Sequence, residues 1–226
     1  MKPSRPAPGA SVALVLALAL GGCYASHEGS RPFDAGPLGG PGAYPIPFAM
    51  ESTEGAPITL RDDDVSAPID LGFSFRFFDS TYTRVVVSSN GFLSFVTSVN
   101  NGCCRGNPIP NRDDVDGIVA YAWTDLFPPG GGTLRTETRG SAPNRRFVLS
   151  AVDQAWCCDT GSPRVTAQVI LREGSDLVEV HVLRQSAGHQ YTQGVEDESG
   201  RRAFFRAGRV ASDYSLERDG TLFITR

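Results

Sequence analysis

The sequence predicts an all-β fold, an antiparallel β-sandwich with many short strands, on three observations. The 226 residues include 25 glycines and 16 prolines, a content that suits short strands joined by many turns. Apolar and polar residues alternate with a period of two along several segments, and no segment shows the pattern of an amphipathic helix of three turns. Short strands at regular spacing between Gly/Pro turns are typical of sandwiches and barrels.

The clearest strand covers residues 69–77, where every odd position is isoleucine, leucine or phenylalanine. Such alternation buries one face of a strand and exposes the other. A hairpin is expected at Asn90-Gly91, a dipeptide that favours a tight turn into the next strand, residues 92–96. Further strands are expected at residues 117–123, 132–138, 146–156, 164–172, 176–183, 190–196, 202–206 and 221–225.

Residues 1–22 are predicted to be a secretory signal peptide. Lys2 and Arg5 supply positive charge ahead of an apolar run at residues 12–20. The run is shorter than the roughly 20 residues that a membrane-spanning helix needs, so export is favoured over a transmembrane anchor.

Leu20-Gly21-Gly22-Cys23 ends this run and resembles the lipobox of bacterial lipoproteins. The resemblance implies cleavage before Cys23, diacylglycerol on the Cys23 thiol and acylation of the new amine, so that acyl chains attach the protein to a membrane. In enterobacterial lipoproteins an Asp after the lipidated cysteine resembles a signal for retention in the inner membrane. Tyr24 stands at that position here, so the resemblance favours the outer membrane as the location. The alternative is an ordinary signal peptide with a chance cysteine.

Residues 23–50 are predicted to form a flexible tether and residues 51–226 a single β domain. Glycine and proline are concentrated between Gly29 and Gly42, as in flexible linkers. No internal repeat and no second linker of comparable length follows. The formal net charge of −4 argues against nucleic acid as a partner.

Residues 70–78 and 82–95 resemble the opening of nidogen-type (NIDO-like) extracellular domains, which also occur in bacterial secreted and surface proteins. In such domains a Trp-x-Asp segment follows the first hairpin, and Trp123-Thr124-Asp125 matches it. The resemblance extends over residues 65–200. Its motifs are structural, so it implies a fold and an extracellular setting rather than a catalytic activity.

Cys103-Cys104 and Cys157-Cys158 are adjacent pairs that depart from the family's pattern. Export permits disulfides, and four cysteines allow three pairings. A bond within a pair is strained, because adjacent Cα atoms lie closer than relaxed disulfide geometry prefers. We therefore expect the two pairs to be cross-linked, in either pattern. Zinc bound by four thiolates is the alternative, although adjacent cysteines lack the usual ligand spacing.

Asp113, Asp114 and Asp116 precede Gly117 and are the candidate ligands for calcium, since carboxylate oxygens near a glycine turn suit this ion. The segment lacks the spacing of an EF-hand loop. Residues 62–64 and 196–198 are also acidic and are expected near one another at one end of the sandwich. The competing interpretation is turn chemistry on a solvated surface, with no metal or other cofactor bound.

The sequence favours a protein that is not an enzyme. His27 lies in the predicted tether and His189 in a turn, while His181 shares a strand face with Glu179 and is expected to face solvent. No Gly-x-Ser-x-Gly motif and no His pair with metal-ligand spacing is present.

The function expected from these observations is that of a lipid-anchored cell-envelope protein with a non-catalytic adhesion or interaction domain. Envelope proteins or extracellular polysaccharide are the expected partners, contacted through the loops at residues 98–116 and 157–163. A carbohydrate-binding module, assisted by calcium, is the first alternative. An extracellular hydrolase is the second, and it would require a nucleophile and a base brought together by the fold.

Overall fold

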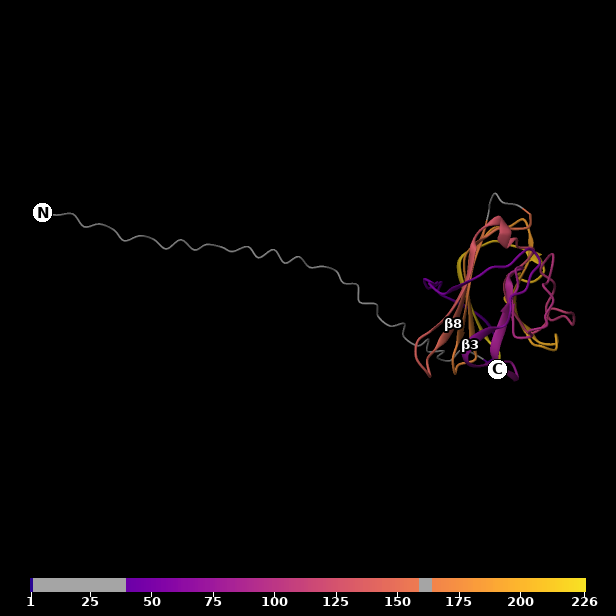
Figure 1. Cartoon of the computed structure of the whole chain (residues 1–226), viewed down its shortest axis with the longest axis horizontal. Helices are drawn as coiled ribbons and strands as arrows, with labels where there is room; N and C mark the ends of the chain where they lie inside the picture. Colours follow the sequence, from indigo (N-terminus) through magenta and orange to yellow (C-terminus); the bar gives the residue numbers. More distant parts are fainter. Residues whose placement is uncertain (2–39, 159–163) are drawn as a thin grey trace. The chain divides into compact units, whose positions relative to one another are not determined.

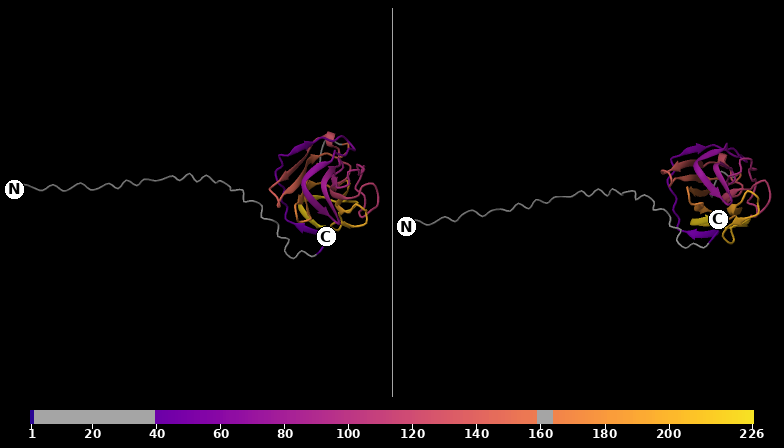
Figure 2. Two further views of the ribbon diagram at one scale, coloured as in Figure 1. Left: turned by 60° about the horizontal axis from the view of Figure 1, so that its bottom comes forward. Right: turned by 90° about the horizontal axis from the view of Figure 1, so that it is seen from below.

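The computed structural model describes Met1, residues 40–158 and residues 164–226, and these residues form two antiparallel sheets (Figure 1). The sheets pack face to face, which confirms the predicted β-sandwich, and Figure 2 shows the two layers from two further directions. A single 3-10 turn, η1 (Pro128–Gly130), is the one helical element among the described residues. No helix in this part of the chain is long and apolar enough to span a membrane.

The first sheet has the strand order β1-β14-β10-β9-β8-β7-β2. Strands β7 to β10 are neighbours both in sequence and in space, as expected for hairpins, whereas β1 and β2 lie at opposite edges. The bounds are β1 Gly42–Ile46, β2 Ala56–Ile58, β7 Thr133–Arg139, β8 Arg146–Gln154, β9 Val165–Arg172, β10 Leu177–Gln185 and β14 Leu216–Ile224.

The second sheet has the order β12-β11-β6-β5-β4-β3, and β13 also pairs with β11. Its central strand β6 lies between β5 and β11, so that a strand near the end of the domain closes against the first hairpins. The bounds are β3 Ile69–Phe77, β4 Ser80–Val87, β5 Phe92–Ser94, β6 Ile118–Trp123, β11 Gln190–Glu196, β12 Ala203–Phe204 and β13 Ser212–Asp213.

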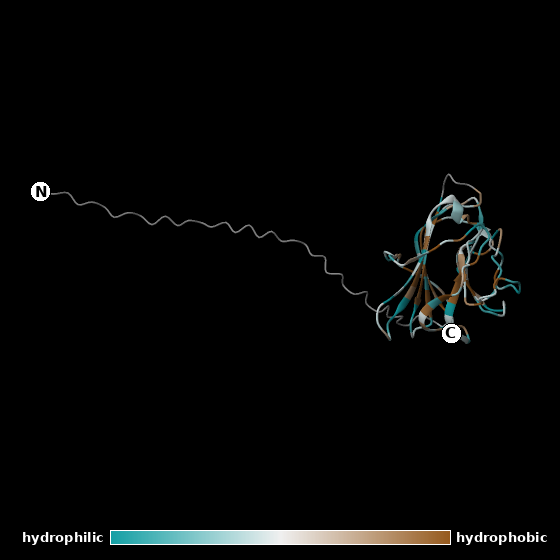
Figure 3. Ribbon diagram, in the orientation of Figure 1, coloured by the Kyte–Doolittle hydropathy of each residue, from teal (hydrophilic) through white to brown (hydrophobic). Residues whose placement is uncertain are grey.

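The main hydrophobic core lies between the two sheets. Strand β3 shows why: Leu71, Phe73, Phe75 and Phe77 are buried, while the residues between them are exposed. The predicted alternation at this strand is therefore confirmed. In Figure 3 the strands of both layers carry most of the hydrophobic colour and the connecting loops most of the hydrophilic colour.

The chain between β1 and β2 covers the outer face of the first sheet, which is the face away from the main core. It crosses the sheet because β1 and β2 occupy opposite edges. Glu51 in this crossing segment bonds Gln168 of β9 through its main-chain N–H at 2.8 Å and its carbonyl at 2.9 Å. The carboxylate of Glu51 accepts two hydrogen bonds of 2.7 Å from Arg146 of β8. Polar side chains that the period-two pattern assigns to solvent are buried here instead.

His181 on β10 is the clearest case, and the expectation that it faces solvent is wrong. Its ring is 1% exposed. Nδ1 accepts a hydrogen bond from the main-chain N–H of Ala49 at 3.3 Å, and Nε2 lies 3.1 Å from Glu179. Burial acts to raise the pKa of Glu179, but hydrogen bonds from His181 and Arg172 hold it below its ordinary value.

The domain begins earlier than residue 51. Strand β1, at Gly42–Ile46, pairs with β14 along its whole length and therefore belongs to the same sheet as the rest of the domain. The last part of the segment expected to be a tether is thus part of a sheet. The predicted signal peptide, Cys23 and most of the predicted tether lie outside the described residues.

Gly91 occupies the turn between β4 and β5 with a φ of +85°. A methyl group at this position would collide with the carbonyl of Ala122 on β6. Gly208 has a similar φ of +77° but open space around it. We expect Gly208→Ala to lower the unfolding free energy by about 1 kcal/mol through backbone strain alone, and Gly91→Ala to lower it at least twice as much, as measured by chemical denaturation. Equal losses of unfolding free energy in the two variants would show that the collision with the carbonyl of Ala122 has no effect on stability.

Candidate functional site: the long loop on the second sheet

The chain between β5 and β6, residues 95–117, forms a long loop over the outer face of the second sheet. The loop closes at its base, where the N–H of Phe95 donates to the carbonyl of Gly117 at 2.9 Å. In Figure 1 it lies on the side of the second sheet away from the first sheet. Loops of this size in compact domains are uncommon and frequently functional, so this segment is the candidate site.

A second, smaller hydrophobic core holds the long loop on the sheet. Ile109 and Val115 from the loop pack against the outward side chains of the sheet, which are Phe92, Ile118, Ala120 and Trp123. Strand β6 is consequently buried on both faces. A strand buried on both sides appears as a continuous apolar run, as residues 118–123 do.

Hydrogen bonds fix the middle of the loop. Trp123 Nε1 donates to the carbonyl of Gly102 at 2.8 Å. The side chain of Gln190 donates to the carbonyl of Gly106 at 2.8 Å, and that of Thr192 donates to the carbonyl of Asn107 at 2.6 Å. Main-chain carbonyls of the loop are therefore bound by side chains of β6 and β11, which holds the loop in one conformation.

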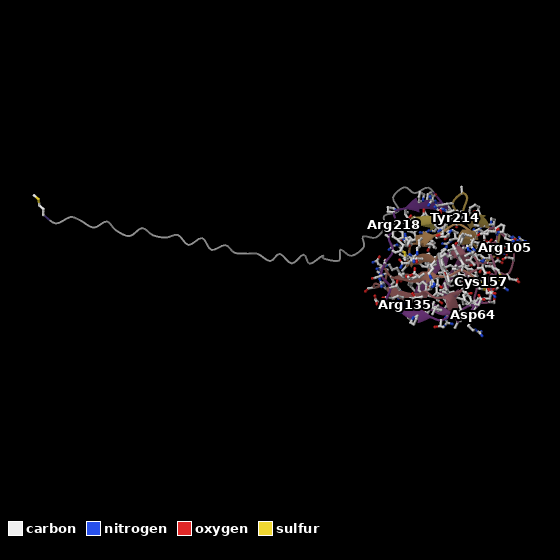
Figure 4. All side chains as sticks on the ribbon, turned by 90° about the horizontal axis from the view of Figure 1, so that it is seen from above. Asp64, Arg105, Arg135, Cys157, Tyr214 and Arg218 are labelled. Atoms are coloured by element: carbon white, nitrogen blue, oxygen red, sulfur yellow. A yellow bond between two sulfur atoms is a disulfide. The ribbon has the colours of Figure 1, made fainter. Side chains whose placement is uncertain are left out.

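The first cysteine pair lies in the middle of the long loop, close to the residues that follow β6. The sulfur atoms of Cys103 and Cys104 and carboxylate oxygens of Asp63 and Asp125 all lie within 4.8 Å of one another. A carboxylate oxygen of Asp62 and the sulfur atoms of Cys157 and Cys158 likewise lie within 4.8 Å of one another. One acidic turn thus lies against both pairs. Figure 4 labels a residue from each part of this region, Asp64, Arg105 and Cys157.

Each pair is joined within itself, Cys103 to Cys104 and Cys157 to Cys158. The expected cross-links between the pairs are therefore wrong for this structure, and the four-thiolate zinc arrangement is not formed. Separate backbone contacts hold the two pairs. The N–H of Cys103 donates to Asn101 Oδ1 at 2.8 Å, and the N–H of Cys157 donates to the carbonyl of Asp125 at 2.9 Å.

The carboxyl group of Asp125, two residues after β6, lies beside the first cysteine pair. Burial, with the negative charges of Asp63 and Asp62, raises the pKa of Asp125 to about 6. Asp63 is held in place by Asn90, whose side chain donates to Asp63 Oδ1 at 2.9 Å. The Trp-x-Asp segment and the Asn-Gly turn of the sequence pattern therefore meet at one place.

The last residues of the long loop are acidic, and this part of the loop contacts the end of β11. Burial and the charges of Asp113 and Asp197 raise the pKa of Asp116 to about 6. Burial and the charges of Asp116 and Asp113 raise the pKa of Glu196 to about 8, although the N–H of Asn111 donates to Glu196 at 2.5 Å. Within residues 40–158 and 164–226, no ion pair includes Asp113, Asp116 or Glu196.

Beside these carboxylates lies an open cavity of about 450 Å³. Its polar lining comes from Ser98, Asn100, Asp113, Asp114, Asp116 and Glu198. Glu198 accepts hydrogen bonds from Tyr82 at 2.6 Å and from Ser80 at 2.9 Å, so its position is set by β4. The cavity can accept polar groups or a cation, because acidic and amide oxygens dominate its wall.

The three predicted acidic segments do not converge on one end of the sandwich. Residues 113–116 and 196–198 come together before β6, where Glu196 is paired with Ile118. Residues 62–64 lie with Asp125 after β6. Among the candidate calcium ligands, Asp113 is held by hydrogen bonds from Asn111, Asn107 and Val115. Glu196 was not among those candidates, although it is the last residue of a predicted strand, residues 190–196, and belongs to the acidic segment 196–198.

Two facing antiparallel sheets, with a long disulfide-bearing loop on the outer face of one, define a β-sandwich domain. A family model described as NIDO related matches residues 44–215, so the chain belongs to the NIDO-related family. The predicted resemblance to nidogen-type domains is confirmed. No curated protein and no solved structure matches the chain.

Peptide mapping without reduction tests the disulfide pattern. Cleavage after arginine releases residues 85–105 with the first cysteine pair and residues 147–164 with the second. We expect two separate peptides, each lighter by two hydrogens than in a reduced control, because each bond closes within its own pair. A single species containing both peptides would instead establish cross-links between the pairs.

Proposed function

We propose that this protein is a lipid-anchored component of the bacterial cell envelope whose β-sandwich binds a partner and catalyses no reaction. The observation that carries the proposal is the long loop, a large irregular segment held rigidly on a buried sheet. Binding surfaces commonly occupy loops on rigid scaffolds. The loop also exposes Cys104 and Arg105 near the acidic turn.

The anchor in this proposal is Cys23, placed at the outer membrane by the lipobox-like sequence before it and by Tyr24 after it. The proposal is tested by mass spectrometry of the N-terminal peptide from protein extracted from its native membranes. Attached acyl chains support the anchor, and an unmodified Cys23 or an intact residue 1–22 segment contradicts it.

The partner in this proposal is another envelope protein or an extracellular polysaccharide, so the domain would act in adhesion or assembly. A photo-crosslinking group placed at exposed Arg105 on the long loop tests this in intact cells. The matched control is the same group at exposed Arg218 on β14, in the first sheet. A partner captured from position 105 and not from position 218 supports the proposal, and equal capture from both contradicts it.

Carbohydrate binding assisted by calcium is the second candidate, favoured by the open cavity with its carboxylate and amide lining. Such groups are those that hold sugar hydroxyls through hydrogen bonds. A glycan array probed with the full chain, with and without a chelator, tests it. Binding that the chelator abolishes supports this candidate, and the absence of any glycan signal removes it.

The proposal omits catalysis because the described histidines are engaged elsewhere. His181 is buried against Glu179, and the ring of His189 lies 3.8 Å, centre to centre, from that of Trp156. A hydrolase would need a nucleophile within hydrogen-bond distance of such a base. Incubation with ester, glycoside and peptide substrates is expected to give no turnover above that of heat-denatured protein.

A further inference from the structure

The two disulfides do not cross-link separate parts of the chain. Each one joins neighbouring residues, Cys103 to Cys104 and Cys157 to Cys158. In the chain-entropy model a disulfide stabilises a fold by closing a loop, and its contribution grows with the length of that loop. A bond between neighbours closes almost no loop, so stabilisation of the fold does not account for the position of both pairs against one acidic turn.

Three segments distant in sequence meet at the first pair. The two sulfur atoms come from the long loop, one carboxylate oxygen comes from Asp63 before β3, and another comes from Asp125 after β6. All four atoms lie within 4.8 Å of one another. A zinc ion binds sulfur at about 2.3 Å and carboxylate oxygen at about 2.0–2.2 Å, so small side-chain shifts bring all four atoms to one ion.

Hydrogen bonds hold these segments together independently of the disulfide. The N–H of Cys103 donates to Asn101 Oδ1 at 2.8 Å, and the side chain of Asn101 donates to the carbonyl of Asp63 at 3.0 Å. The side chain of Asn90 donates to Asp63 Oδ1 at 2.9 Å. Asn101 thus connects the cysteine pair to Asp63 directly, and the group keeps its arrangement when the sulfur–sulfur bond is opened.

The two carboxylates of this group lack a partner of opposite charge. Asp64, in the same turn, pairs with Arg61, whereas no ion pair in the described part of the chain includes Asp63 or Asp125. Asp63 and Cys104 are exposed, while Asp125 and its neighbour in the group, Cys103, are half-buried. A reductant and a metal ion can therefore reach the group from solvent.

We propose that the first cysteine pair is a zinc site that opens on reduction, where the thiolates of Cys103 and Cys104 and the carboxylates of Asp63 and Asp125 bind one ion. Thiolate sulfur and carboxylate oxygen are both zinc ligands, and four ligands complete a tetrahedral site. The ion connects three segments that the disulfide leaves unconnected. This site is independent of the membrane anchor and of the partner proposed above.

The sulfurs become ligands only after a two-electron reduction. A dithiol reductant supplies two electrons and two protons, so that the Cys103–Cys104 bond breaks to give two thiols and the reductant closes its own disulfide. Zinc then binds both sulfurs as thiolates, and the two thiol protons pass to solvent. The second pair has one carboxylate at the same closeness among the described residues, that of Asp62, so it is expected to bind zinc more weakly.

Metal binding to the full chain, compared before and after reduction, tests the proposal. Cys23→Ser in every sample removes the fifth thiol, and the dithiol is removed without oxygen before metal is added. Equilibrium dialysis with limiting zinc is expected to give one ion per reduced chain and none per oxidised chain. Cobalt(II) in place of zinc should give the absorption of thiolate-to-metal charge transfer. No zinc on the reduced chain, or equal zinc on both forms, overturns the proposal.

Two double variants assign the ion to one cysteine pair. Cys103→Ser with Cys104→Ser should abolish the cobalt absorption at one equivalent of metal. Cys157→Ser with Cys158→Ser is the matched control and should keep it, because the second pair lacks the fourth ligand. Equal absorption in the two double variants contradicts the assignment to the first pair.

The variants Asp63→Asn and Asp125→Asn test the two carboxylate ligands. Each should lower the zinc affinity of the reduced chain by about tenfold or more. Asp114→Asn, an exposed acid of the long loop outside this group, is the matched control and should leave the affinity unchanged. Wild-type affinity in both Asp63→Asn and Asp125→Asn overturns the proposal. If either variant fails to fold by circular dichroism, the wild-type dialysis and cobalt absorption still decide whether the reduced pair binds metal.

Discussion

Replacing Trp123 with alanine is expected to lower the free energy of unfolding by about 3–5 kcal/mol. The side chain is 1% exposed and packs edge-on against Phe92. Its Nε1 also holds the carbonyl of Gly102. The variant thus loses a large apolar side chain from the second core and leaves a buried carbonyl without its donor. Chemical denaturation followed by circular dichroism measures the loss.

Two further variants separate the contributions at this position. Trp123→Phe keeps most of the apolar volume and removes the hydrogen bond to Gly102, so a smaller loss is expected, of about 1–3 kcal/mol. Phe205→Ala removes an aromatic residue that is 41% exposed, and its effect should stay within about 0.5 kcal/mol. A Trp123→Ala variant as stable as the Phe205→Ala variant would show that the long loop is not held by this core.

Asp219→Asn is expected to lower the free energy of unfolding by about 3 kcal/mol at neutral pH. Arg209, which is 8% exposed, donates to the two oxygens of Asp219 at 2.6 and 2.8 Å and to Gln193 at 2.7 Å. Asp219 lies on β14 of the first sheet and Gln193 on β11 of the second. Arg209 thus links the two layers, and the variant leaves its buried charge uncompensated.

Asp79→Asn is the matched control for this prediction. Asp79 also pairs with an arginine, Arg202, at 2.6 Å, but its side chain is 74% exposed. Exposed ion pairs contribute about 0–1 kcal/mol, so little change is expected. Equal losses in the two variants would contradict the role given to Asp219.

The Asp219 pair also predicts a dependence on pH. Burial acts to raise the pKa of Asp219, but hydrogen bonds and charge from Arg209 and Arg206 hold it below its ordinary value. A lowered pKa in the folded state adds stability above the unfolded value, roughly 3.9, and this stability is lost as pH falls through the folded value. Wild-type stability should therefore fall more steeply in acid than that of Asp219→Asn.

The strands of this protein could be predicted because their cause is local. The odd positions of residues 69–77 and the Asn-Gly turn at residue 90 depend on side chains two residues apart or adjacent, and the structure has a strand or turn in each place. The same holds for β7 to β10, which follow one another as hairpins. Strand β1 was missed because its partner β14 lies at the other end of the chain.

Burial of the outer faces could not be predicted in the same way. Alternation shows which side of a strand is apolar, but it does not show what lies over the polar side. His181 is buried because residues between β1 and β2 cross the sheet, and Ala120 is buried because the long loop covers β6. Both coverings come from segments distant in sequence.

The chain's composition, turn residues and period of two were sufficient for the class of fold and for the family, since each strand carries its own alternation and each tight turn its own residue types. The sequence did not show which of the acidic side chains and cysteines lie together in the folded protein. Asp116 meets Glu196, Asp125 meets Asp63, and each cysteine pair closes on itself. Such meetings depend on contacts between segments far apart along the chain, and residue spacing in a sequence does not contain them.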